Sequence, residues 1–182
     1  MFRFDTTITE ERYTEFNLFH NEKSKYGRKI IGWYRTALVM LLVIMSILVV
    51  VRNLEAGWSV LVSLIPIFFV CGLFFVLIKP FIRLGNKLTI KMASKIGKNL
   101  YSPVSTMEFF EEYVVETTPE IETKTSYTAL DCAYFVRGEV VYIYINIQQA
   151  LILPRASFES QEQWDSFFEF IKVKIKDITV VE

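Results

Sequence analysis

The sequence predicts an α+β membrane protein, in which a two-helix transmembrane hairpin carries a cytoplasmic antiparallel β domain closed by a C-terminal helix. Three features of the 182 residues predict this class. Two apolar runs without a charged residue, 36–51 and 56–78, follow each other in the first half. Short stretches rich in β-branched and aromatic residues fill the last third, as is typical of strands. An amphipathic pattern up to Ile175, preceded by a capping box of Ser160 and Gln163, then predicts a final helix.

Residues 1–29 are the first predicted segment, a cytoplasmic strand followed by a helix. Phe2 and Phe4 alternate with polar residues, which is the pattern of a half-buried strand. Thr9 is a candidate N-cap for the helix, and acidic residues follow it in the first turn. So short a segment cannot bury a core of its own. We therefore expect its strand to add to the edge of the C-terminal domain.

Residues 30–78 are the predicted transmembrane hairpin, with spans at about 30–51 and 56–78. Roughly 20 apolar residues cross the ~30 Å hydrocarbon core of a bilayer as a helix. The second run reaches that length alone. The first reaches it when residues 30–35 are included and Arg35 extends toward the headgroups. Residues 52–55 are then the loop, and so short a loop makes the two spans antiparallel neighbours.

Basic residues flank the hairpin on its outer sides and are nearly absent from its loop. Lys23, Lys25, Arg28 and Lys29 precede the first span, and the loop offers only Arg52. A second basic group follows the hairpin. Because basic flanks stay on the cytoplasmic side, the sequence predicts that both termini are cytoplasmic.

Residues 79–100 are predicted to form a separate basic juxtamembrane helix, because Pro80 lacks the N–H that a continuous helix needs. An apolar row of Leu84, Leu88 and Met92 runs beside the cations. Two interpretations stay open: the helix lies in the membrane interface and binds anionic lipid headgroups, or its cations only set the topology and its apolar row packs on the β domain. The candidate lipid-contact residues are Lys79, Arg83, Lys87, Lys91, Lys95 and Lys98.

Residues 101–182 are the predicted β domain. Its expected strands are 107–110, 113–117, 121–127, 132–136, 140–145 and 150–153. Short antiparallel strands closed by one amphipathic helix resemble the pleckstrin-homology-like (PH-like) layout. One face of strand 140–145 is aliphatic and the other aromatic or polar, which makes Tyr142, Tyr144 and Arg155 a candidate partner surface. The alternative is that these residues pack under the N-terminal segment.

Composition argues against several classes of function. A net charge of zero gives no electrostatic basis for binding nucleic acid. His20 is the single histidine, and no Gly-rich phosphate loop, paired-cysteine zinc motif or nucleophile elbow is present. We therefore expect no catalytic residue, metal or cofactor. Binding or scaffolding at the membrane face, with a protein partner or a second copy, is the expected function; the alternative is a component of a membrane transporter or of a membrane-embedded enzyme complex.

Two segments near the end of the chain carry a family resemblance. Residues 142–145 (Tyr-Ile-Tyr-Ile) and 150–158 place an aliphatic strand, then Pro154-Arg155 and Phe158, before the final helix. Together with the strand-helix start and the hairpin, they resemble the YcxB-like family of small bacterial membrane proteins. The resemblance implies a PH-like domain, location in the bacterial cytoplasmic (inner) membrane, and no catalytic residues. The chain departs from the family at Ser126-Tyr127, where a tryptophan is commoner.

Overall fold

The computed structural model describes residues 1–56, 60–95, 101–136, 138–147 and 149–181, except for the side chains of 53–56, 60–63 and 94. The chain divides into two compact units. The β unit combines Met1–Tyr13 with Asn99–Glu182, and the helical unit is Thr14–Lys98. The predicted segment 1–29 is thus divided between the two units.

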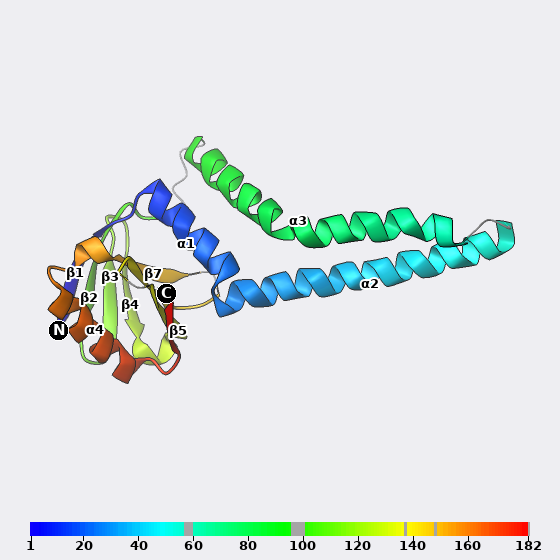
Figure 1. Ribbon diagram of the computed structural model, residues 1–182. Helices are drawn as coiled ribbons and strands as arrows, with labels where there is room; N and C mark the ends of the chain where they lie inside the picture. The colour runs from blue at the N-terminus through cyan, green and yellow to red at the C-terminus, as the bar shows by residue number, and fades with distance from the viewer. Residues whose placement is uncertain (57–59, 96–100, 137, 148, 182) are drawn as a thin grey trace. The chain divides into compact units, whose positions relative to one another are not determined.

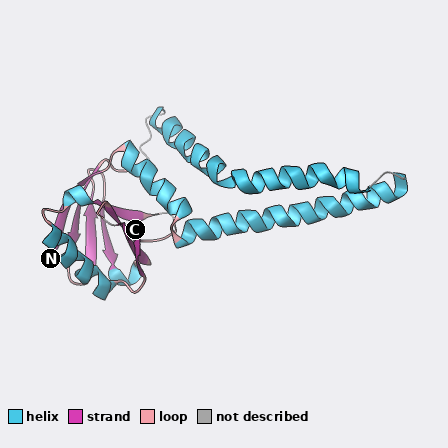
Figure 2. Ribbon diagram, viewed as in Figure 1, coloured by secondary structure: helices cyan, strands magenta, loops and turns pink. Residues whose placement is uncertain are grey.

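Two four-stranded sheets form the β unit (Figure 2). The first has the order β1-β2-β3-β4 and is antiparallel throughout, with strands at Phe2–Thr7, Val104–Phe109, Tyr113–Thr117 and Glu122–Ser126. The second has the order β7-β6-β5-β8, with β5 to β8 at Cys132–Val136, Val140–Tyr144, Ala150–Pro154 and Ile178–Val181. The expected strands are all present, with ends shifted by up to three residues.

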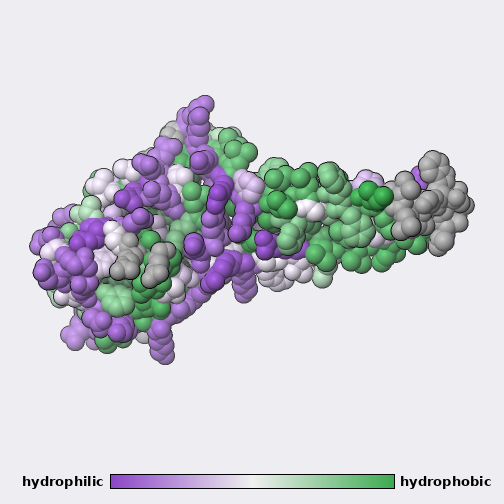
Figure 3. All heavy atoms as spheres, viewed as in Figure 1, coloured by the Kyte–Doolittle hydropathy of each residue, from purple (hydrophilic) through white to green (hydrophobic). Residues whose placement is uncertain are grey.

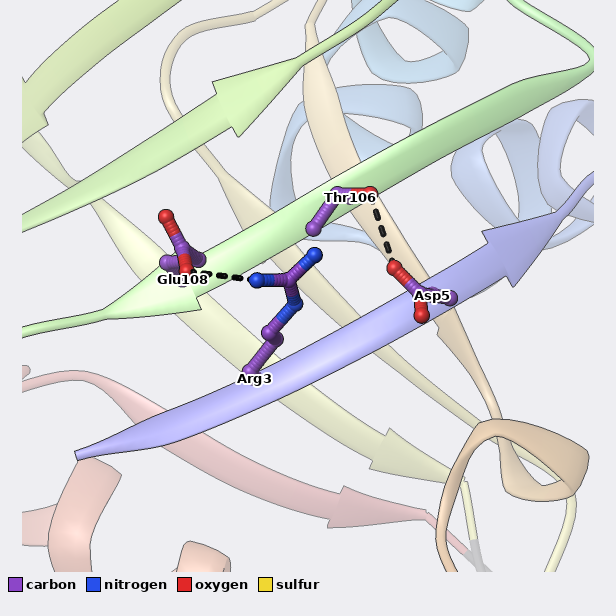
Figure 4. A network of polar contacts seen from close by, with 4 residues as sticks. All are labelled: Arg3, Asp5, Thr106 and Glu108. Carbon is purple, nitrogen blue, oxygen red and sulfur yellow. Dashed lines mark hydrogen bonds and ion pairs between the residues drawn. The ribbon is translucent and has the colours of Figure 1, made fainter.

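Strand β1 adds an edge strand to the C-terminal domain, as predicted. It pairs with β2 in antiparallel register from Phe2 opposite Phe109 to Thr7 opposite Val104. Figure 4 shows two side-chain contacts across this pair. Arg3 Nη1 donates to Glu108 Oε1 at 3.4 Å, and Thr106 Oγ1 donates to Asp5 Oδ1 at 2.7 Å.

Helix α4, Gln161–Lys174, packs its apolar stripe into the core of the β unit. Ser160 caps its first turn by accepting the backbone N–H of Gln163 at 3.2 Å, which confirms the predicted cap. Phe167 is fully buried, and its ring centroid lies 5.1 Å from that of Phe4 and 4.9 Å from that of Phe109. Aromatic edge-to-face contacts of this kind therefore join α4 to β1 and β2.

The expectation that a helix closes the chain is wrong, because β8 follows α4. The helix ends at Lys174, and β8 then runs parallel to β5, with Ala133 opposite Ile178. Ala133 donates its backbone N–H to the carbonyl of Asp177 at 2.9 Å. A strand after α4 thus extends the second sheet past β5.

Helices α1 (Glu10–Glu22) and α2 (Lys25–Ala56) meet at a tight corner. Thr9 caps α1 by accepting the N–H of Arg12 at 3.2 Å, as predicted. Ser24 Oγ accepts the N–H of Gly27 at 3.0 Å in the first turn of α2. A Cβ on residue 27 would lie 2.0 Å from the carbonyl oxygen of His20, so the corner requires glycine.

Helices α2 and α3 (Val60–Lys95) lie side by side as a hairpin (Figure 1). Segments Lys25–Arg52 and Leu64–Ala93 are long and apolar enough to cross a membrane, and the most apolar stretch of each contains no buried residue. Figure 3 shows hydrophobic side chains over most of the described part of the hairpin. The expected loop at 52–55 is wrong, because α2 continues through Ala56.

Candidate functional site: the basic segment of α3

The basic segment, residues 79–95, is the C-terminal part of α3 and not a separate helix. The expected break at Pro80 is wrong, since α3 runs from Val60 to Lys95 with Pro66 and Pro80 inside it. Figure 1 shows a bend within α3, and interior prolines are the usual cause of a helix kink. The segment therefore remains connected to the apolar part of α3 through helical backbone.

One face of the basic segment exposes large apolar side chains. Leu84, Leu88 and Met92 are 56%, 51% and 61% exposed. Their spacing of four residues keeps them on one slowly winding row of the helix. Ile90, about half a turn away from this row, is only 5% exposed. The segment thus has one covered face and one exposed apolar face.

The described cations of the segment fall into two groups. Arg83 Nε donates to a carboxylate oxygen of Glu22 at the end of α1, and this hydrogen bond holds the pKa of Glu22 below its usual range. The charge of Lys79 lowers the same pKa further. Arg83 and Lys79 therefore act on α1. Lys98, the last candidate, lies outside the described residues.

The second group, Lys87, Lys91 and Lys95, is exposed beside the apolar row. Each follows a member of the row by three residues, so the lysines form a strip along one side of it. Within the part of the chain that the structure describes, none of these three forms an ion pair. An exposed apolar row with a strip of cations beside it has the pattern of a helix that lies in a membrane interface.

The candidate partner surface falls on residues with little accessible area. Tyr142 and Tyr144 are 3% and 0% exposed, and the rings of Tyr134 and Tyr144 are in edge-to-face contact at 5.6 Å. Neither tyrosine is accessible to a partner in this structure. Val141 and Ile143, on the opposite face of β6, belong to the hydrophobic core, as their alternation predicts.

Arg155 has a local structural role between β7 and α4. Its guanidinium donates to the carbonyl of Phe158 at 3.3 Å and to Gln161 Oε1 at 3.4 Å, and it lies 5.6 Å from the ring of Trp164. These contacts fix the chain that leads into α4. The two tyrosines and Arg155 therefore do not form one exposed surface.

Sequence reasoning missed Glu22 as the partner of the basic segment. Glu22 and Arg83 are 61 residues apart, and no local pattern links them. The signal that could have found the pair is the helical corner at Ser24 and Gly27, which turns α1 relative to α2.

Comparison with known proteins gives no assignment for this site. No family model, curated protein or solved structure matches the chain.

Proposed function

We propose that the chain is an integral protein of the bacterial cytoplasmic membrane that holds a PH-like binding or scaffolding domain at the cytoplasmic surface. In this proposal α2 and α3 cross the bilayer and both termini are cytoplasmic. The basic segment of α3 lies in the headgroup layer and binds anionic lipids. The resemblance to the YcxB-like family supports the location and the PH-like layout of the domain.

The observation that carries the proposal is the exposed row of Leu84, Leu88 and Met92 beside the lysine strip. Exposed leucine and methionine side chains are costly in water, and burying each in hydrocarbon is worth about 1.5–3 kcal/mol. Lysines close to an anionic membrane surface add about 1 kcal/mol each. An interface with anionic lipid takes up the apolar row in its hydrocarbon and the lysine strip among its headgroups.

The architecture of the β unit supports the PH-like part of the proposal. Seven of its eight described strands precede one amphipathic helix, and that helix packs its apolar stripe against both sheets. Strand β8 is a departure from the expected layout, because it follows the helix. A domain of this kind held at a membrane surface can present its loops and edges to a protein partner.

The test measures how deeply the basic segment lies in a bilayer. Met92→Cys, in full-length protein with Cys71→Ala and Cys132→Ala, is labelled with an environment-sensitive fluorophore. The protein is reconstituted in vesicles with or without phosphatidylglycerol, and quenching by brominated lipid chains is recorded. We expect stronger quenching with phosphatidylglycerol. Replacing Lys87, Lys91 and Lys95 with Gln removes on the order of 3 kcal/mol and reduces quenching to the level of neutral vesicles.

A charge-matched control separates a local effect from one of net charge. Lys124, Lys172 and Lys176 of the β unit are replaced with Gln, and quenching is expected to match that of the unsubstituted protein. An equal loss of quenching in both triple variants would contradict the role given to the basic segment. Quenching that does not depend on phosphatidylglycerol would contradict it as well.

A further inference from the structure

Helices α2 and α3 together line an open apolar groove. Its volume is about 480 Å³, within the range of roughly 300–1,000 Å³ that is usual for ligand pockets. Tyr34, Leu38 and Leu41 of α2 face Phe74, Ile78 and Phe81 of α3 across it. The rings of Phe74 and Phe81 are parallel, with centroids 6.2 Å apart. Among the residues that the structure describes, the tyrosine hydroxyl is the only polar side-chain group that lines the groove.

The two ends of the groove differ in chemistry. Leu41 and Phe74 lie at the end within the uncharged runs, whereas Tyr34 and Phe81 lie toward the basic flanks. Arg35 follows Tyr34 directly, and Lys79 follows Ile78. Tyrosine rings favour the boundary between hydrocarbon and headgroups. An occupant therefore meets hydrocarbon-like walls along its length, and the end at Tyr34 and Phe81 lies toward the basic flanks of the sequence.

The groove continues on α3 into the exposed row of the basic segment. Phe81 precedes Leu84 by three residues and Leu88 by seven, so all three lie on one side of α3. Lys87 lies beside this row and is exposed. The apolar surface that begins in the groove thus leads to the lysine strip.

The chemistry of the groove favours a hydrocarbon chain with an anionic head. Its walls are apolar along about 10 Å of α2, from Tyr34 to Leu41. Beyond Phe81, the described part of α3 continues with the exposed apolar row and the exposed Lys87. A phospholipid tail matches the apolar walls, and an anionic headgroup matches the lysine.

We propose that this groove binds the acyl hydrocarbon of one anionic phospholipid, whose headgroup lies among the basic residues at its cytoplasmic end. This inference rests on the proposed function, because it requires the groove to lie in a bilayer. It goes further in assigning a defined site on the hairpin to a single lipid molecule.

The test counts phospholipid bound to the intact protein by native mass spectrometry. Full-length protein in mild detergent is incubated with phosphatidylglycerol or with phosphatidylcholine of the same chains. We expect one retained phosphatidylglycerol per chain and at least fivefold less phosphatidylcholine. Ala37→Trp and, separately, Leu41→Trp fill the groove and are expected to reduce phosphatidylglycerol retention at least fivefold. Val39→Trp is the matched control, because Val39 is 54% exposed and lies outside the groove.

Three outcomes overturn this inference. Equal retention in the groove-filling and control variants places the lipid elsewhere. Equal retention of the two lipids removes the role of headgroup charge. A dimer that Ala37→Trp dissociates makes a second copy the occupant. Each of these outcomes leaves the quenching test of the basic segment unchanged, whereas recovery of the full chain without membranes overturns the proposed function itself.

Discussion

The first sheet of the β unit contains a cluster of polar side chains, which belong to Thr6, Ser105 and Glu116. Thr6 and Ser105 are almost completely buried, and Thr6 Oγ1 donates to the carbonyl of Ser105 at 3.0 Å. Glu116 lies on β3, beside β2. Burial raises its pKa, although a hydrogen bond with Ser105 opposes the shift. The ionised carboxylate is thus disfavoured in the folded state.

We expect Glu116→Gln to stabilise the β unit at pH 7 and to have little effect below about pH 4.5. A carboxyl whose folded pKa is raised contributes stability below its unfolded pKa and loses it as the pH rises through the folded value. Gln is neutral throughout, so its advantage should grow from pH 4 to pH 7. Thermal unfolding of the unsubstituted protein and of Glu116→Gln, recorded from pH 4 to pH 7, measures this difference in stability. A difference in stability between the two proteins that does not change with pH would contradict the raised pKa of Glu116.

At the scale of elements, β1 is the strand on which the β unit depends most clearly. Its Phe4 is fully buried between Phe109 and Phe167, whereas Arg3 on the same strand is exposed. We expect Phe4→Ala to lower the free energy of unfolding by about 3–5 kcal/mol. Arg3→Ala removes one exposed ion pair and should cost less than about 1 kcal/mol.

Denaturant unfolding of the full chain measures both changes. Since a domain has a total stability of about 5–15 kcal/mol, loss of the whole strand should remove most of it. A fragment that starts at Ser102 is therefore expected to fold poorly. Equal stability of that fragment and the full chain would show that β1 is dispensable.

Local patterns predicted most elements, and the misses have physical reasons. The alternation in β6, the caps at Thr9 and Ser160 and the stripe of α4 depend on neighbours in sequence. The helix continues through Pro80, although proline removes one backbone hydrogen bond. Strand β8 forms by pairing with β5, which is about 45 residues away in the sequence. The pattern of neighbouring residues does not indicate such a long-range pairing.

The sequence predicted the apolar row and the lysines of the basic segment. It did not predict which residues elsewhere in the chain contact that segment. The spacing of four residues in the basic segment identified Leu84, Leu88 and Met92 together with the lysines. The pairing of Glu22 with Arg83 and the groove between α2 and α3 each join residues some 30–60 positions apart. Such contacts follow from how helices pack, and a single sequence does not specify them.

At the scale of the whole molecule, the proposed function depends on the hairpin crossing a membrane. Two helices long and apolar enough to span a bilayer belong to one unit, and the sheets and their core belong to the other. If the hairpin crosses the membrane, the connection near Arg52 lies on the opposite side from the β unit. This arrangement is the premise of the proposed function and of the lipid site.

Labelling of single cysteines in spheroplasts of expressing bacteria tests this premise most directly. Arg52→Cys and Val173→Cys replace exposed residues in the last two turns of α2 and on α4, in protein with Cys71→Ala and Cys132→Ala. A membrane-impermeant maleimide is expected to label Arg52→Cys in intact spheroplasts and Val173→Cys only after lysis. Labelling of Val173→Cys before lysis, or of Arg52→Cys only after it, would contradict a hairpin that crosses the membrane with both termini in the cytoplasm.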